Sequence, residues 1–373
     1  MSASAVPAAP PNLGVLFRIW SLHLLSFVIP SITLAFLLTG PHAWYTSVLF
    51  ILPLVAIVIA DRTLGHERRQ PLAKQPAWPF DLLVYALTAL QLWMIYLVGR
   101  MYAQQSFFSM DMLMAVVVVG TSSGFSIITA HELIHRPVWW ERLLGRALLV
   151  TVLYEHFYTE HIRGHHVRVG TLEDGATARF GETFRQFYRR TVPQQFKSAW
   201  RLECTRLGDP QMRLADARQL GNRVLHGVAA GVLLAASIGA AFGVTAFFAF
   251  LLQAQAASRL LEVVNYFEHW GLQRSAKRVQ PIDSWDTHSW FTYYALVGLS
   301  RHADHHAYAS RAYQDLRVWD EAPVLPRGYV SLIPMILANN PKFRRLATAE
   351  LERHKLGPFA PALATPVAVA SGE

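Results

Sequence analysis

Six long apolar runs constrain the fold of this 373-residue chain more than any other feature of its sequence. They lie near residues 20–38, 43–60, 82–98, 110–130, 224–241 and 244–261. Each run is roughly 17 to 21 residues long, which is about the length of helix that crosses the hydrocarbon core of a bilayer. We therefore expect an all-α fold: a polytopic integral membrane protein with about six transmembrane helices. A soluble helical protein with buried helices would not need so many runs of this length.

The composition supports a membrane protein. Hydrophobic residues make up 53% of the chain, charged residues only 16%, and the formal net charge is +9. We do not expect a nucleic-acid partner, because the basic residues fall in the loops between apolar runs, where membrane lipids and the positive-inside rule account for them.

The loop charges predict an orientation. The loop between the second and third runs carries Arg62, Arg68, Arg69 and Lys74, and the long segment 131–223 is also rich in Lys and Arg. The turns on the opposite side have almost none. The basic side is predicted to be cytoplasmic. The protein would then be a multi-pass protein of the bacterial inner (plasma) membrane, with both termini in the cytoplasm.

The ends of the chain differ from its middle. Residues 1–12 are small, Pro-rich and uncharged, and residues 358–373 are similar, so we expect a disordered lead and a disordered tail around one domain at 13–357. Cys204 is the one cysteine. A single thiol excludes an intramolecular disulfide and a thiolate zinc or iron–sulfur site within the chain, and we expect Cys204 to be buried.

Histidines gather in four short stretches on the predicted cytoplasmic side: HELIH (131–135), EHIRGHH (160–166), NYFEHWGL (265–272) and RHADHHA (301–307). In the first two, His131 with His135 and His161 with His165 are four residues apart, so on a helix each pair shares a face and can bind one metal. One zinc ion takes about four ligands, whereas nine imidazoles could serve two ions. Imidazole suits iron, copper, nickel and zinc alike. The nine candidate ligands are His131, His135, His161, His165, His166, His269, His302, His305 and His306.

Four carboxylates neighbour these histidines: Glu132, Glu160, Glu268 and Asp304. Metal-bound imidazoles usually donate their other N–H to a carboxylate or carbonyl, so these acids are predicted to orient the ligands and to offset the charge of the ions. The alternative is that some of them form surface ion pairs with neighbouring arginines.

Two other classes of protein remain open from the residues alone. HELIH by itself is the signature of a zinc metallopeptidase that uses Glu132 as its base, but a peptidase would leave the other seven clustered histidines unexplained. A metal transporter would place histidines or carboxylates inside the apolar runs, and these runs are nearly free of charge.

The four motifs together resemble the membrane alkane monooxygenases, within the superfamily of di-iron fatty acid desaturases and hydroxylases. The resemblance covers roughly residues 40–345 and includes LEDGATARFGETF and YQDLRVWDEAPVLPRGY. It implies a six-helix membrane fold with a cytoplasmic di-iron site whose ligands are the nine histidines. It implies O₂-dependent hydroxylation of the terminal C–H bond of an alkane to a primary alcohol. Electrons would come from a rubredoxin or ferredoxin and its NAD(P)H-dependent reductase.

The resemblance leaves the substrate open. Trp270 stands where the family usually has Tyr, Ser300 where it usually has Gln, and SWDTHSW (284–290) differs from the usual Trp-Asn-Ser pattern. Fatty acyl, terpene or alkyl-aromatic substrates, hydroxylated or desaturated, are alternatives. In the family a bulky residue of the second span limits chain length, which would place Leu54 and Ile57 on the substrate channel.

A basic patch follows the second histidine stretch. It could dock an acidic electron-transfer partner or hold anionic lipid headgroups. Its residues are Arg179, Arg185, Arg189 and Arg190.

Overall fold

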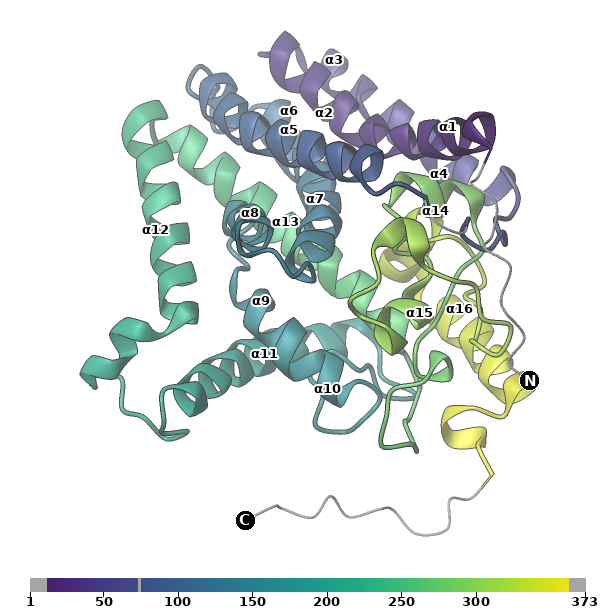
Figure 1. The fold of residues 1–373 in the computed structure, drawn as a ribbon. Helices are drawn as coiled ribbons and strands as arrows, with labels where there is room; N and C mark the ends of the chain where they lie inside the picture. The colour runs from purple at the N-terminus through teal and green to yellow at the C-terminus, as the bar shows by residue number, and fades with distance from the viewer. Residues whose placement is uncertain (1–11, 73–74, 362–373) are drawn as a thin grey trace.

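The computed structural model describes residues 12–72 and 75–361 and is built from helices, with no strand longer than an isolated bridge in that part of the chain (Figure 1). Six of the described helices are long and apolar enough to cross a membrane: Leu13–Thr39, Trp44–Thr63, Trp78–Tyr102, Met110–Ile134, Arg223–Phe242 and Val244–His269. The predicted all-α, six-span membrane fold is confirmed. Residues 1–11 of the predicted N-terminal lead and most of the predicted tail lie outside the described residues, although Asn12 caps the first helix and a 3-10 helix covers Gly357–Phe359.

Several spans consist of more than one helical piece. The first joins α1 (Leu13–Leu22), η1 (His23–Phe27) and α2 (Val28–Thr39), the second joins α3 (Trp44–Leu49) and α4 (Ile51–Thr63), and the third is α5 (Trp78–Tyr102). The fourth joins α6 (Met110–Met114), a π-helical turn η2 (Ala115–Val119) and α7 (Gly120–Ile134). The fifth and sixth are α12 (Arg223–Phe242) and α13 (Val244–His269).

The fourth and sixth spans pack tightly against each other through α7 and α13. A Cβ added at Gly124 would lie 2.5 Å from Leu260 Cδ2, and one at Gly120 would collide with the side chain of Ala256. Small residues four positions apart let two helices pack backbone to backbone in a membrane. This contact brings together the ends of the two spans, where His131 and His269 lie.

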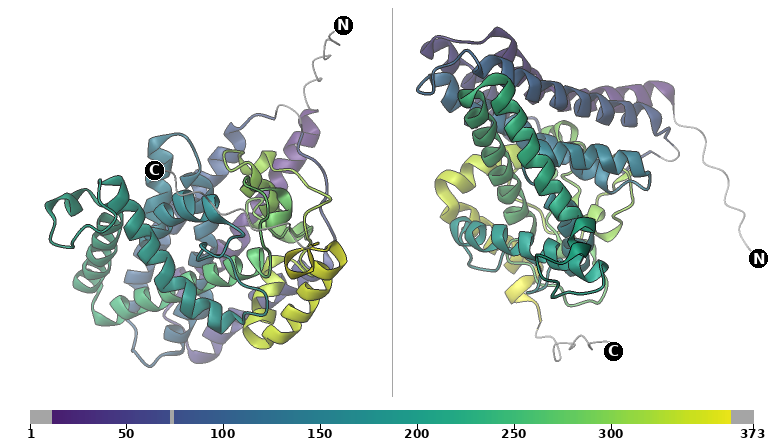
Figure 2. Two further views of the ribbon diagram at one scale, coloured as in Figure 1. Left: turned by 90° about the horizontal axis from the view of Figure 1, so that it is seen from below. Right: turned by 90° about the vertical axis from the view of Figure 1, so that its left-hand side faces the viewer.

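The remaining helices cover one end of the bundle. In both Figure 1 and the right view of Figure 2, α11 and α16 lie at the end of the molecule opposite α3 and α6. The connection between the fourth and fifth spans forms α8 (Trp139–Thr151), α9 (His156–Glu160), η3 (His161–His165), α10 (His166–Arg168), α11 (Phe184–Arg206) and η4 (Ala217–Gly221). The segment after the sixth span forms η5 (Pro281–Asp283), α14 (Trp290–Ala295), α15 (His302–Ala307), η6 (Tyr313–Asp315) and α16 (Tyr329–His354).

Candidate metal centre

Nine histidines meet in two groups between the ends of α7 and α13 and the covering helices. In each group every residue offers one ring nitrogen, and these nitrogens all lie within 4.8 Å of one another. The five-histidine group is His131, His135, His161, His166 and His305, and the four-histidine group is His165, His269, His302 and His306. Ligand atoms about 2.1 Å from one ion lie at most about 4.2 Å apart, so the spread of each group is close to that of a single-ion site.

The Nε2 atoms face the middle of each group. In the first group, Nε2 of His161 lies 3.0 Å from Nε2 of His135 and 3.0 Å from Nε2 of His166. In the second, Nε2 of His302 lies 3.2 Å from Nε2 of His269 and 3.0 Å from Nε2 of His306. Nε2 atoms that face one another at this distance cannot all carry a proton. The arrangement therefore suits lone pairs directed at one shared cation better than a set of hydrogen bonds between the rings.

Burial keeps the imidazoles of His161, His166 and His305 neutral. The pKa values of His161, His166 and His305 lie well below the ordinary 6.5. The largest cause is burial, which penalises the charged ring, and the second is repulsion from the neighbouring imidazoles. A neutral imidazole keeps a lone pair for a metal at neutral pH.

The two groups are linked through α15 and η3, each of which contributes to both. In α15, His302 and His306 are four residues apart and join the four-histidine group, while His305 points to the other. In η3 the pairing differs from the prediction. His161 does not join His165, because residues 161–165 form a π-helical turn in which the backbone N–H of His166 donates to the carbonyl of His161. That turn places residues five apart on one face, so His161 pairs with His166.

A carboxylate that the motifs did not indicate supports the four-histidine group. Asp174 is fully buried, and its Oδ2 lies 2.9 Å from Nδ1 of His165 and accepts from the Thr177 hydroxyl at 2.6 Å. Burial alone would raise the pKa of Asp174, but His165 and the Thr177 hydrogen bond outweigh it and lower the pKa to about 2. Asp174 therefore holds the His165 ring with Nε2 toward its group.

Of the four predicted orienting acids, one lies against a histidine. Glu268 Oε2 is 3.3 Å from Nε2 of His302, the nitrogen that faces the group, and no group of the described residues donates to its Oε1. The other three acids pair with arginine side chains instead. These guanidinium groups lie closer to the carboxylates than any imidazole does. Glu132 accepts from Arg136 at 3.0 Å, and Glu160 accepts from Arg168 at 2.9 Å.

Asp304 is the third of these acids. It is fully buried, and its carboxylate accepts from Arg311, from the Trp319 indole at 2.7 Å and from the Arg317 backbone at 3.0 Å. Asp304 therefore fastens the loop after α15 to that helix and makes no hydrogen bond to an imidazole among the described residues.

The SWDTHSW stretch positions α15. The backbone N–H of Trp285 donates to the carbonyl of Glu268, and its indole donates to the carbonyl of Trp270, both at 2.9 Å. The buried carboxyl of Asp286 accepts from the backbone N–H of Ala303 at 2.7 Å, in the first turn of α15. This segment therefore connects the end of α13 to the start of α15.

An apolar cavity adjoins both histidine groups. It has a volume of about 30 Å³ and lies between α7, α13 and the turn after α14, and its walls include His131, His161, Glu268 and His302. Most of its other lining is apolar, from Ile127, Ile128, Leu260, Leu261, Val264 and Leu299 among others. Leu54 and Ile57, predicted for a substrate channel, do not line it: Ile57 is buried in the core, and Leu54 packs against that core from α4.

Comparison with known proteins identifies the family. The sequence model of the fatty acid desaturase family matches residues 107–334, which include all nine histidines. Alkane 1-monooxygenase 2 of Pseudomonas aeruginosa is 35% identical over 310 residues, which are 80% of this chain and 81% of that protein. The chain belongs to the alkane 1-monooxygenase family. The resemblance predicted from the four histidine motifs is confirmed.

Two further members show how far the similarity extends. Alkane 1-monooxygenase 1 of Pseudomonas aeruginosa is 38% identical over 229 residues, 60% of this chain and 59% of that protein. Alkane 1-monooxygenase of Acinetobacter baylyi is 34% identical over 294 residues, 75% of this chain and 70% of that protein. The chain thus spans somewhat under two thirds of the length of alkane 1-monooxygenase 1 of Pseudomonas aeruginosa and a larger share of the Acinetobacter baylyi protein.

Proposed function

We propose that this protein hydroxylates the terminal, unactivated C–H bond of an alkane or similar alkyl chain to a primary alcohol, using O₂. One observation carries the proposal: two histidine groups open onto an apolar cavity inside a membrane bundle. Membership of the alkane 1-monooxygenase family supports the same reaction.

The donor set fits two iron ions, one in each histidine group. Neutral imidazoles are suitable ligands for ferrous and ferric iron, and Glu268 beside His302 would offset part of the added charge. When bound, the irons would supply the activation of O₂ and the oxidising power needed to break a strong C–H bond. Asp174 would keep His165 in the tautomer that presents Nε2.

The cavity would select and orient the substrate. Its largely apolar walls favour the methyl end of a hydrocarbon chain and would place that end beside His131 and His302. Ile128 precedes His131 by one helical turn, so the wall and the ligand share a face of α7. Alignment of one terminal methyl group beside the histidines would give a primary alcohol rather than a mixture.

Electrons are proposed to come from a rubredoxin or ferredoxin with its reductase, on the cytoplasmic face of the inner membrane. His135 and His166 are half-buried, whereas the four-histidine group is fully buried, so the five-histidine group lies nearer the solvent. Arg179, Arg185 and Arg189 are exposed on the covering helices and their loops, where they suit an acidic donor or anionic lipid. Arg190 instead is bound to Glu182.

The peptidase alternative meets a specific obstacle. A zinc peptidase would use Glu132 to activate water, but both hydrogen bonds of Glu132 go to the Arg136 guanidinium, at 3.0 and 3.3 Å. Both histidines of HELIH also belong to a group of five, more than a single zinc site uses.

Metal analysis and product analysis together test the proposal. The protein purified in lipid nanodiscs should hold about two irons per chain, and one zinc per chain would exclude a di-iron oxygenase. With rubredoxin, its reductase, NADH and O₂, it should convert an n-alkane to the primary alcohol, as read by mass spectrometry. A panel of alkanes, fatty acids and alkyl-aromatics that gave no oxygenated or desaturated product would overturn it.

A further inference from the structure

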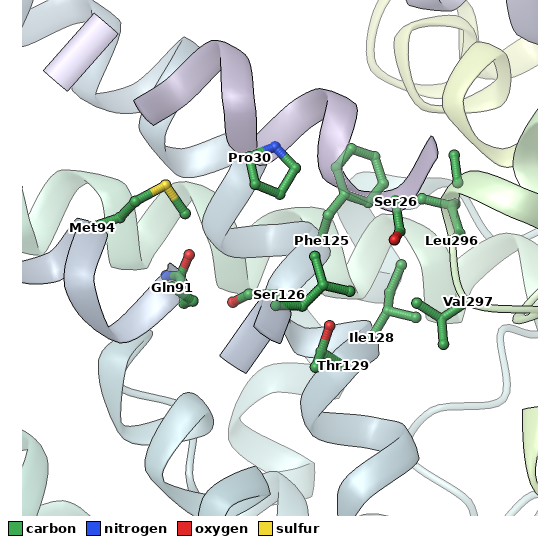
Figure 3. Close-up of a pocket in the computed structure, with 12 residues that line it drawn as sticks. Ser26, Pro30, Gln91, Met94, Phe125, Ser126, Ile128, Thr129, Leu296 and Val297 are labelled. Carbon is green, nitrogen blue, oxygen red and sulfur yellow. The ribbon is translucent and has the colours of Figure 1, made fainter. Parts of the chain in front are cut away.

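The spaces inside the bundle are small, and a much larger hollow lies on its surface. Figure 3 shows the space between α2, α5 and α7, which has a volume of about 20 Å³ and is lined by Gln91, Met94 and Phe125 among others. Like the cavity of about 30 Å³ beside the histidines, it has room for roughly one or two water molecules. A groove of about 310 Å³ lies on the outer surface of α11 and is large enough for the headgroup of a lipid.

Aromatic and basic side chains line this groove together. Phe196, Lys197, Trp200 and Arg201 come from consecutive turns of α11, and Leu214 comes from the loop that follows the helix. The ring centroids of Phe196 and Trp200 are 6.3 Å apart, so the two rings form one apolar wall. Leu214 is 79% exposed. Exposed apolar side chains beside Lys and Arg are typical of a helix that contacts the membrane interface.

The two cations of the groove have no carboxylate partner among the described residues. Lys197 and Arg201 are exposed and lie four residues apart on one face of α11, where like charges repel each other. Glu203 is the only acid of α11, and its carboxylate is occupied by Arg163 at 2.8 Å and Arg206 at 2.7 Å. A phosphate group between Lys197 and Arg201 would supply the missing negative charge.

The groove lies at the level where the fifth span begins. Glu203 Oε2 accepts from the backbone N–H of Arg223, the first residue of α12, at 3.0 Å. Arg206 donates to the carbonyl of Gly221 at 2.6 Å. Figure 1 shows α11 next to the lower end of α12. The end of α11 that carries the groove is therefore fixed to a span where that span leaves the bilayer.

The first half of α11 lies against another span. Gln255 of α13 donates to the Tyr188 hydroxyl at 2.8 Å, and the Arg259 guanidinium lies 5.8 Å from the centre of the Tyr188 ring. Gln255 and Arg259 are both exposed on the sixth span. Val192 and Phe196 follow Tyr188 at four-residue intervals and continue this side of the helix toward the groove. Helix α11 therefore runs along the bilayer surface, with Phe196 toward the lipid.

We propose that this groove binds an anionic phospholipid of the surrounding bilayer, on the side that carries the histidines. The phosphate diester pairs with Lys197 and Arg201, and the glycerol and the first acyl carbons pack on Phe196, Trp200 and Leu214. A zwitterionic lipid fits less well, because the lining contains two cations and no acid to pair with an ammonium group. An acidic protein fits less well, because the groove lies at the bilayer surface and its lining is largely apolar.

Native mass spectrometry of the full chain in detergent tests the proposal with two lipids of identical acyl chains. Wild-type protein should bind phosphatidylglycerol at least tenfold more tightly than phosphatidylcholine. In Lys197→Gln/Arg201→Gln, the affinity for phosphatidylglycerol should fall about tenfold, the effect of one charge-assisted hydrogen bond, while that for phosphatidylcholine changes less than about twofold. Trp200→Ala should weaken both lipids by a similar factor, because it removes apolar contact and no charge.

Lys277→Gln/Arg278→Gln is the matched control. It removes the same two charges at exposed positions in the loop after α13, outside the groove, and should leave the preference for phosphatidylglycerol unchanged. Equal affinity of wild type for the two lipids, or a preference that survives Lys197→Gln/Arg201→Gln, would overturn the inference. So would a groove variant that keeps the lipid preference but loses affinity for rubredoxin, since the groove would then be a protein-docking site.

Discussion

His161 and His166 lie five residues apart, yet their Nε2 atoms are 3.0 Å from each other. The π-helical turn η3 makes this possible, because its i→i+5 geometry brings them onto one face and leaves His165 for the other group. A regular α-helix would pair His161 with His165 and divide the nine imidazoles differently. One local backbone irregularity therefore determines how the ligands are shared between two sites.

Gly164 is needed inside this turn. A Cβ at Gly164 would lie 2.5 Å from both Glu160 Oε1 and Arg168 Nη2, so Gly164→Ala should displace the Glu160–Arg168 ion pair and distort η3. We expect bound metal per chain to fall at least twofold, measured by elemental analysis of the folded fraction. Gly239→Ala, where the nearest atoms lie at an ordinary 3.4 Å, should keep full metal content. Equal metal in the two variants would contradict the role given to the turn.

Asp174 should control metal affinity through His165. Asp174→Asn keeps the shape of the side chain but removes the negative charge beside His165 Nδ1. Loss of such a partner typically costs about 10- to 100-fold in metal affinity, so a chelator should strip metal from Asp174→Asn at a much lower concentration than from wild type. Asp320→Asn, at an exposed carboxylate, is the control. A chelator titration that superimposes for all three proteins would refute this assignment.

Hydropathy predicted the spans well, because every backbone N–H and C=O in lipid must be hydrogen-bonded within the protein. A single apolar segment can meet that requirement by forming an α-helix. Hydropathy placed the end of the sixth span at 261, whereas α13 continues to His269. The last turns carry Glu262, Asn265 and Glu268, which lower the hydropathy but are buried against the covering helices. These turns are helical and buried by protein beyond the membrane, but their low hydropathy is the same as that of a loop, so a hydropathy window does not assign them to the span.

The orienting residues were harder to predict than the histidines. Asp304 stands among three histidines in sequence, but Arg311 and Trp319 reach its carboxylate from a later loop. Asp174 is nine residues from His165 and becomes its partner only when the loop after α10 folds back. Nearness in sequence does not predict the hydrogen-bond partner of a buried carboxylate, because tertiary packing determines which donor lies next to it.

Glu155 gives a pH dependence of stability that can be measured. Burial raises the pKa of Glu155 from 4.5 to about 7, against the opposing effect of Arg146. The folded protein thus binds this proton more tightly than the unfolded chain. Its stabilising contribution is complete below pH 4.5 and is lost as the pH rises through about 7. Relative to wild type, Glu155→Gln should gain stability as the pH rises from 5 to 8, by on the order of 1–3 kcal/mol.

Melting temperatures of both proteins at several pH values check this expectation. Glu173→Gln, at an exposed side chain, should track wild type at every pH. A difference between Glu155→Gln and wild type that stays flat from pH 5 to pH 8 would mean that Glu155 is ionised throughout, with the Arg146 ion pair outweighing burial.

His269 should be required for one metal ion and not for the other. It is the last residue of α13 and belongs only to the four-histidine group, so His269→Ala leaves three imidazoles there and all five in the other group. We expect iron to fall from about two to about one per chain and alkane hydroxylation to fall at least a hundredfold. His156→Ala is the matched control, since His156 is buried in the same covering layer but belongs to neither group. It should keep two irons and its activity. Two irons retained in His269→Ala would show that His269 is not a ligand, and loss of both would show that the two groups do not bind metal independently.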